Sequence, residues 1–296
     1  MTPDTLLAAC RFLHDGALMA LWGSFAYLAT LVPRRLAEQL ADRLTIYRLA
    51  AVSLVLLTTC ASLPLQAAMI GDGWPDAVNG QVLADVITST STGKAWLWQL
   101  SAAGALAIAQ CASAHLAPRA TAATAGLALA TLAFTGHAVM QDGWQGVAHP
   151  LNDILHVLAA GAWFGALLPL LVVLRQFGQP PLKAEATIAL TRFSRAGHWA
   201  VALAILTGIA NSLFIVGWPL GWSSTYQTLL TAKIAVVLVM TAVAVLNRYW
   251  YVPRLGRDRA SALAAIRVGT LLEIGLGVAA ILLVSIFGLL DPSGGD

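Results

Sequence analysis

The chain has 296 residues, of which 58% are hydrophobic and 10% are charged, and its mean hydropathy is +0.76. Because a soluble globular protein carries about 25% charged residues, this chain has too few polar groups to face water on all sides, and we expect an integral membrane protein. Its net charge of +3 does not indicate nucleic-acid binding, because the positive charges lie in short connections and form no patch interleaved with aromatic residues, and we expect no nucleic-acid partner.

Eight apolar segments are long enough to cross a bilayer, which takes about 20 mostly apolar residues in a helix. In chain order they cover residues 5–32, 44–70, 95–114, 121–142, 151–174, 196–217, 227–250 and 263–290. We expect the longest connection, 71–94, to be an ordered loop with one short helix. The predicted fold is an all-α bundle of eight transmembrane helices in one membrane domain, 1–296, made of a five-helix part, 1–175, and a three-helix part, 190–296.

The basic residues are distributed asymmetrically among the connections. The odd-numbered connections and their flanks contain Arg34, Arg35, Arg43, Arg48, Arg119, Arg175, Lys183, Arg192, Arg195, Arg248, Arg254, Arg257, Arg259 and Arg267. The even-numbered connections contain only Lys94. Since cytoplasmic loops carry the excess of Lys and Arg, we predict that the odd connections are cytoplasmic and that both termini lie on the outer side.

Three of the six histidines, His137, His149 and His156, surround one short turn between the fourth and fifth spans. On the fifth span His149, Asp153 and His156 have the spacing i, i+4, i+7, which puts them on one helical face. Pro150 is a favoured first-turn residue, so we expect the helix to begin near it, with His149 at the cap. Polar groups inside membrane helices are costly and indicate a function.

The first span adds a similar pair, because Cys10 and His14 are four residues apart and Asp15 follows directly. Imidazole suits copper, zinc and nickel, whereas thiolate and thioether ligands favour Cu(I). We therefore predict a copper site near the outer face whose ligands are His14, His137, His149 and His156. Asp15 and Asp153 would be ligands or would orient the imidazoles.

Each of these residues also has an ordinary structural interpretation. A histidine near the membrane surface is often solvated or hydrogen-bonded, and for His149 this interpretation has equal weight. The thiol of Cys10 and the thioethers of Met19, Met69 and Met140 are expected to fill gaps in the packing. Histidine and carboxylate ligands suit Cu(II), and added sulfur ligands would shift the preference to Cu(I), so the oxidation state stays open.

Two further charges lie inside the predicted spans. Lys233 is about two turns into the seventh span from the outer face, and Glu273 is two to three turns into the eighth span from the cytoplasmic face. An ion pair between them near the midplane would ease the cost of burial. Such a pair would be either structural or part of a gate or proton-coupled step.

Several polar motifs follow one another along the whole chain. They are His149-Pro-Leu-Asn-Asp-Ile-Leu-His156 with Trp163-Phe-Gly165 and Pro169, Arg192-Phe-Ser-Arg195, Leu206-Thr-Gly208-Ile-Ala-Asn211, Leu229-Leu-Thr-Ala-Lys233, Leu246-Asn247-Arg248, Val252-Pro253-Arg254-Leu255 and Glu273. In this order and spacing they resemble the CopD/PcoD copper-resistance membrane proteins. The match is looser between residues 71 and 94, which puts a ligand in that loop in doubt.

The resemblance implies a multi-pass protein of the bacterial inner membrane that moves copper between periplasm and cytoplasm. It also implies a small periplasmic CopC-like copper carrier as a partner. The positions carried over from the family are His137, His156, Asn152, Asp153, Lys233, Asn247, Arg248 and Glu273. Of these, Asn152, Asp153, Lys233 and Glu273 would surround the metal or form a gate, and Asn247 and Arg248 would be structural.

Two other functions stay open. A b-type haem redox protein would use two histidines on facing helices as axial ligands. A copper-binding membrane sensor or scaffold would bind the metal without moving it. No nucleotide-binding loop or phosphorylation motif is present, which argues against ATP-driven pumping, and we expect no enzymatic activity. Direction of transport, energy source and oligomeric state are not determined by the sequence.

Overall fold

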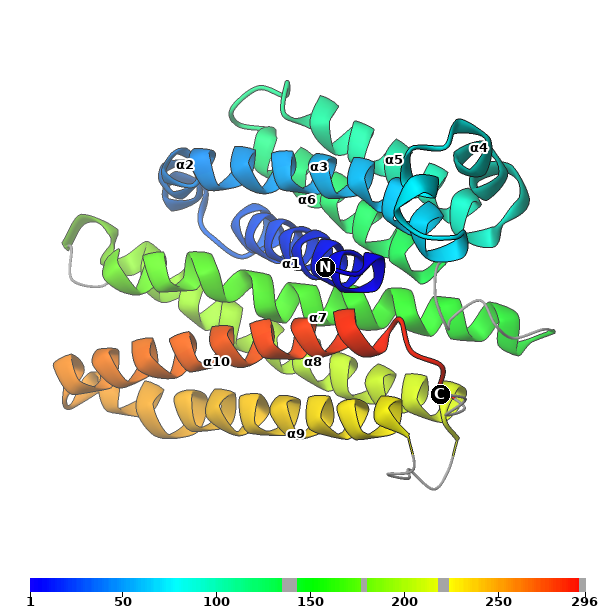
Figure 1. Cartoon of the computed structure of the whole chain (residues 1–296). Coiled ribbons are helices and arrows are strands. Elements are labelled where there is room, and N and C mark those ends of the chain that lie inside the picture. Colours follow the sequence, from blue (N-terminus) through cyan, green and yellow to red (C-terminus); the bar gives the residue numbers. More distant parts are fainter. Residues whose placement is uncertain (135–142, 177–179, 218–223, 293–296) are drawn as a thin grey trace.

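Helices form every regular element in the parts of the chain that the computed structural model describes, residues 1–134, 143–176, 180–217 and 224–292 (Figure 1). The α-helices are α1 (Pro3–Thr30), α2 (Arg34–Arg43), α3 (Thr45–Ile70), α4 (Gly80–Ser89), α5 (Ser91–Ala109), α6 (Ala117–Ala130), α7 (Gln145–Gln176), α8 (Lys183–Ile215), α9 (Thr225–Leu246) and α10 (Arg259–Phe287). The short turns are η1 (Trp74–Val78), η2 (Thr131–Phe134), η4 (Pro180–Leu182), η5 (Asn247–Tyr251) and η6 (Val252–Gly256). This confirms the all-α prediction.

Polar side chains mark the starts of several helices. Thr2, Thr90, Ser224 and Asp258 each accept a hydrogen bond from a backbone N–H in the first turn of the helix that follows. These N–H groups have no partner within the helix, so a side-chain acceptor at this position stabilises the start by about 1 kcal/mol. The chain therefore encodes the starts of α1, α5, α9 and α10 locally.

Five helical segments in the described part of the chain are long and apolar enough to cross a membrane. They are α3, α7, α8, the segment Thr225–Gly256 that contains α9, and α10. The other three predicted spans coincide with α1, α5 and α6, which do not meet the same criteria of length and composition. Helix α6 has 14 residues and is followed directly by η2, and residues 135–142 of the predicted span 121–142 lie outside the described residues. Five membrane-spanning helices are thus supported, and the number eight stays a prediction.

The central helix of the bundle is α1. It packs against α3 and α6 on one side and against α7 and α10 on the other (Figure 1). Helix α8 packs on α7, and α9 packs on α10. The polar residues predicted on the first, fifth and seventh spans therefore lie on helices that surround one interior.

The contact between α1 and α7 is unusually close. A Cβ atom added to Gly23 of α1 would collide with the backbone of Gly161 and Gly165 of α7, and one added to Gly165 would collide with the backbone of Met19. The Ser24 hydroxyl donates to the Gly165 carbonyl at 2.8 Å. Small residues let membrane helices approach in this way, and here they fix the position of α7 against α1.

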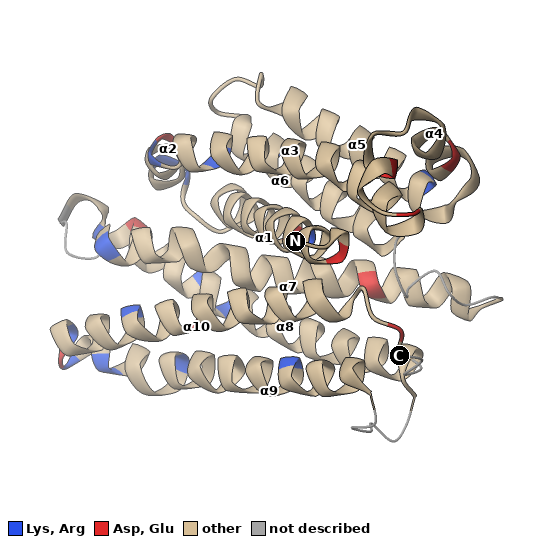
Figure 2. Ribbon diagram, in the orientation of Figure 1, with Lys and Arg blue, Asp and Glu red and all other residues tan. Residues whose placement is uncertain are grey.

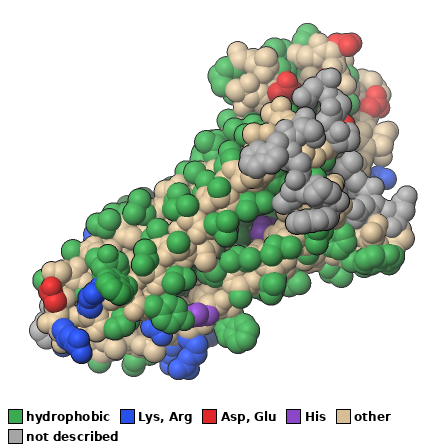
Figure 3. Space-filling model, turned by 90° about the horizontal axis from the view of Figure 1, so that it is seen from below, with side chains coloured by type: hydrophobic (Ala, Val, Ile, Leu, Met, Phe, Trp, Pro, Cys, Tyr) green, Lys and Arg blue, Asp and Glu red, His purple; other side chains and the backbone are tan. Residues whose placement is uncertain are grey.

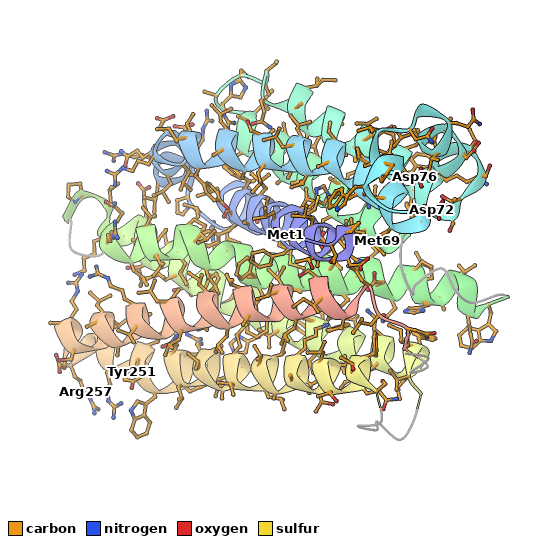
Figure 4. All side chains as sticks on the ribbon, viewed as in Figure 1. Met1, Met69, Asp72, Asp76, Tyr251 and Arg257 are labelled. Carbon is orange, nitrogen blue, oxygen red and sulfur yellow. The ribbon has the colours of Figure 1, made fainter. Side chains whose placement is uncertain are left out.

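Charged residues divide between the two ends of the bundle. Lys and Arg gather at the end where α2 and the start of α10 lie, whereas Asp residues gather near α4 at the other end (Figure 2). Asp72 and Asp76 lie at the α4 end, and Tyr251 and Arg257 at the opposite end (Figure 4). Hydrophobic side chains cover much of the long face between them (Figure 3). This separation agrees with the asymmetry in the sequence, and the orientation in the membrane stays a prediction.

Replacing Gly165 by Val should destabilise the protein, because the new side chain would force α1 and α7 apart. Overpacking of this kind costs about 1–3 kcal/mol and should lower the thermal unfolding midpoint of the protein purified in detergent. The matched control is Gly104→Val in α5, where an added Cβ meets no atom within 4 Å. Equal midpoints for the two variants would contradict the close helix contact.

Candidate functional site

A cavity of about 520 Å³ lies in the half of the bundle that contains the start of α7, and residues of α1, α3, α5, α7, α8, α9 and α10 line it. On α7 its lining includes His149, Asp153, His156, Ala160 and Trp163. This is the i, i+4, i+7 face that the sequence predicts, extended by two turns. At 1.5 Å per residue the stripe is about 21 Å long, so the cavity reaches deep into the bundle.

Helix α9 lines the opposite wall of the cavity with a matching stripe. Its members are Tyr226, Leu230, Lys233, Val237 and Met240. On both helices the ionisable groups lie in the outer part of the stripe, and the innermost members are the apolar side chains of Trp163 and Met240. The cavity therefore has a polar end and an apolar floor.

Hydrogen bonds to α8 determine which ring nitrogen of His156 is free. Its Nδ1 lies 3.0 Å from the Ala204 carbonyl oxygen and 3.1 Å from the Thr207 hydroxyl. The carbonyl oxygen can only accept, so Nδ1 carries a proton and Nε2 of the neutral ring keeps its lone pair. A ligand histidine is commonly held by a carbonyl in this way. Gly208 gives the ring room, since a Cβ there would lie 3.1 Å from Cε1.

His14 is held similarly by α3. Its Nδ1 lies 2.9 Å from the Thr58 hydroxyl, and that hydroxyl donates its only hydrogen to the Leu54 carbonyl at 2.7 Å. His14 is therefore the donor, and its Nε2 is also free of a proton when the ring is neutral. The Cys10 thiol donates to the Thr58 carbonyl at 3.3 Å, so one residue of α3 positions both side chains.

His149 is more deeply buried than the sequence suggests. The expectation that α7 begins near Pro150, with His149 at its cap, is wrong: the helix begins at Gln145, since the Trp144 carbonyl already accepts from the Ala148 N–H at 2.9 Å. The His149 side chain is 1% exposed, and its ring stacks on Phe214 of α8 at 5.0 Å. Among the described residues its Nδ1 has no hydrogen-bond partner, which costs about 1–3 kcal/mol and leaves this nitrogen able to bind a metal.

A chain of amides joins α7 to α8 beside these histidines. The Asn211 amide donates to Asp153 Oδ1 at 2.8 Å. The Asn152 amide donates to Asn211 Oδ1 at 2.6 Å and to the Thr207 carbonyl at 2.8 Å. Asn152 is thus a structural link, and Asp153 keeps one carboxylate oxygen outside these bonds. Thr58, Thr207 and Asn211 were not predicted as site residues, although the i, i+4 pair Thr207 and Asn211 is a polar signal within an apolar span.

Two carboxylates and two cations share the polar end of the cavity. Lys233 is close enough to Asp153 and His156 to interact electrostatically, and its ammonium lies 6.0 Å from the centre of the Phe287 ring. Asp15 interacts with Arg11 and with Asp153. Among the described residues, neither the Asp15 nor the Asp153 carboxylate lies within 4.0 Å of the Lys233 ammonium, the distance that defines an ion pair. Arg11 and Lys233 thus partly offset the negative charges of Asp15 and Asp153 without forming ion pairs with them among the described residues.

The expected pair between Lys233 and Glu273 does not form. The carboxylate of Glu273 instead accepts from the Asn247 amide at 2.9 Å and from the Trp163 indole N–H at 3.4 Å. Lys233 precedes Asn247 by about 21 Å of helix at 1.5 Å per residue. The two charges therefore lie at different depths of the bundle, because α9 and α10 pack antiparallel with Lys233 beside Phe287.

The described residues bring His14, His149, His156, Asp15 and Asp153 to one cavity. No group of three His, Cys, Asp or Glu side chains in these parts of the chain is close enough to hold a metal ion. His137 and Met140 lie outside the described residues. Met19 and Met69 line the cavity with Cys10, whereas Cys60 and Cys111 are exposed. The donor atoms thus gather loosely around the cavity.

Comparison with known families matches two descriptions. Residues 1–147 match "Copper resistance protein D-like, N-terminal domain", and residues 187–287 match "Copper resistance protein D". The chain is 34% identical over 307 residues to copper resistance protein D of Pseudomonas syringae pv. tomato, with 98% of this chain and 97% of the relative covered. It is 32% identical over 284 residues to inner membrane protein YebZ of Escherichia coli (strain K12), with 96% and 97% covered.

Two more distant similarities accompany these. Copper transport protein CutJ of Bacillus subtilis (strain 168) is 28% identical over 194 residues, which are 61% of this chain and 34% of that protein. Among solved structures, the bd oxidase from Geobacillus thermodenitrificans has a similar fold, with a TM-score of 0.50 and 11% identity, covering 99% of this chain and 88% of that one. This likeness concerns the fold alone.

Replacing Asn211 by Ala should loosen α8 from α7, because Asp153 and Asn152 would each lose a buried partner. Leaving such groups unsatisfied costs about 1–3 kcal/mol, which thermal unfolding in detergent would register. The control is Ser212→Ala, whose hydroxyl only donates to Gly208 within α8. If both variants unfold at the wild-type temperature, the amide chain does not hold the two helices together.

Proposed function

The chain belongs to the copper resistance protein D family, and from this premise we propose that it carries copper across the bacterial inner membrane. The cargo, Cu(I) or Cu(II), would enter the cavity that His14, His149 and His156 line and would cross without any enzymatic reaction. Integral membrane character is supported by the five long apolar helices. The relatives named for copper resistance and copper transport support the choice of metal.

The observation that carries the proposal is the orientation of His156. It lines the cavity with its Nδ1 proton held by the Ala204 carbonyl, so that Nε2 is the ring nitrogen able to bind a cation. Imidazole is a good ligand for copper. His14 offers a second oriented nitrogen, and His149 offers one that has no partner among the described residues. We infer that His137 supplies a further ligand.

Eight membrane spans with both termini in the periplasm would put this cavity on the periplasmic side. In this arrangement the basic end of the bundle faces the cytoplasm, as the distribution of Lys and Arg favours. Asp72, Asp76 and Asp85 then surround the outer end near α4 and would attract cations. A periplasmic CopC-like carrier could deliver copper at this end.

Replacing His137 and His156 together by Ala should remove high-affinity copper binding, because each loss deletes one imidazole ligand. We expect the affinity of the purified protein to fall at least about tenfold, the typical result of losing an oriented ligand or its support. Copper binding measured by a competing chelator checks this. His115→Ala and His198→Ala are the controls, since both residues are exposed and lie outside the cavity lining.

Unchanged binding in the double variant would overturn the assignment of these ligands. Uptake of copper into vesicles that contain the purified protein then separates transport from sensing. A transporter raises the copper content of the vesicle interior above that of protein-free vesicles. A sensor or scaffold binds copper at the surface and leaves the interior unchanged.

A second candidate function is that of a b-type haem redox protein. It is favoured by the size of the cavity, about 520 Å³, which is much more than one metal ion needs, and by the histidines that line it from α1 and α7. Facing histidines are common axial ligands of haem. If this candidate is correct, the purified protein has a Soret absorption band that His156→Ala shifts or abolishes. A colourless protein from haem-replete cells would eliminate it.

A further inference from the structure

A buried carboxylate lies directly beyond the floor of the cavity. Glu273 in the middle of α10 is 4% exposed, although a carboxylate inside a membrane bundle is costly to keep. It shares a hydrogen bond with Trp163, whose ring lines the cavity. The Trp163 side chain therefore links Glu273 to the cavity.

Helical spacing puts Glu273 of α10, and its partner Asn247 after α9, on the same helix faces as the residues that line the cavity. On α10 the lining begins at Gly277, one turn after Glu273. On α9 it ends at Met240, and Asn247 follows two turns later on the same face. The layer formed by Trp163 and Met240 thus separates the polar end of the cavity from the pair of Glu273 and Asn247.

Local features of two helices, α9 and α10, hold this carboxylate in place. Helix α9 changes to π geometry at Asn247–Tyr251, a distortion often found at functional sites. Gly269 of α10 makes room for the Asn247 amide, because a Cβ there would collide with it. A packing role alone would be met by an apolar side chain at 273 at lower cost.

The groups that contact Glu273 are uncharged. From α9 its partner is Asn247, and from α7 its partner is Trp163. On its own helix the nearest charged residue toward the basic end is Arg267, whose guanidinium donates to the Leu174 carbonyl at 3.4 Å. No Lys, Arg or His in the described residues interacts with Glu273 strongly enough to balance its charge.

The cluster can satisfy Glu273 with or without a proton. The ionised carboxylate accepts from both Asn247 and Trp163. The protonated form donates its O–H to the amide oxygen of Asn247 after a flip of that amide, and it still accepts from Trp163, because asparagine offers both a donor and an acceptor. A proton can therefore be bound and released without breaking the cluster.

We propose that Glu273 is a proton-binding site that exchanges one proton for each copper ion passing the Trp163–Met240 layer. The proposal rests on the proposed copper transport. When no copper is at this level, a proton on Glu273 removes the uncompensated charge. When copper passes, the cation supplies the positive charge, the O–H bond breaks, and the proton leaves toward the opposite side. The transporter is then a copper–proton exchanger.

Reconstituted vesicles with the membrane potential clamped at zero test this directly. With one proton exchanged per copper ion, a gradient of one pH unit should change the final inside-to-outside copper ratio about tenfold. Proton movement reported by a pH-sensitive dye inside the vesicles should accompany the copper flux. Glu273→Gln keeps the hydrogen-bonding shape but cannot release a proton, so the effect of the pH gradient should disappear.

Two control measurements distinguish failure of the proposed copper transport from failure of the proposed proton site. The Glu273→Gln protein should unfold in detergent at a midpoint close to that of wild type, which shows that it is folded, and Glu38→Gln on the exposed part of α2 should respond to the gradient as wild type does. Absence of copper flux in wild type overturns the proposed function. Copper flux that ignores the pH gradient, or a response that persists in Glu273→Gln, overturns the proton site alone.

Discussion

The close crossing of α1 and α7 is the contact on which the rest of the structure depends. Gly23 and Gly165 allow the two backbones to touch, and the Trp22 indole N–H adds a hydrogen bond to the Leu158 carbonyl at 2.8 Å. In a membrane, where apolar surfaces have no preference for one another over lipid, such close packing and hydrogen bonds drive helix association. The contact fixes the relative depths of His14 of α1 and His156 of α7, which both line the cavity.

The helices around this contact have different tasks. Helices α1 and α7 supply the histidine donor atoms. Thr58 of α3 orients His14 of α1, and Ala204 and Thr207 of α8 orient His156 of α7. Because the orienting acceptors are backbone carbonyls or hydroxyls already bound to the backbone, they cannot rotate to release the ring proton. The tautomers of His14 and His156 are thus fixed by secondary structure, which makes the positions of their free ring nitrogens insensitive to small side-chain movements.

Much of the site could be predicted from local spacing. The i, i+4, i+7 pattern correctly put His149, Asp153 and His156 on one face, because a helix imposes this geometry whatever surrounds it. The burial of His149 could not be predicted, since it depends on Phe214 of another helix and on a helix start one turn earlier. Pairing Lys233 with Glu273 failed because the sequence gives the depth of a residue only relative to the end of its span. The short turns η5 and η6 shift that end for α9.

The charges at the polar end indicate how a cation could be accepted there. Asp153 interacts with Lys233 but does not form an ion pair with it in the described residues, and only its Oδ1 is bound by Asn211. A tight buried ion pair would be strongly destabilised by removing one partner, so a carboxylate locked in one could not turn toward a metal. In the proposed transporter, this loosely balanced carboxylate, which also interacts with His149, would exchange the ammonium for an incoming cation. Without a tight pair among the described residues, the same cavity would hold its charges both when empty and when loaded.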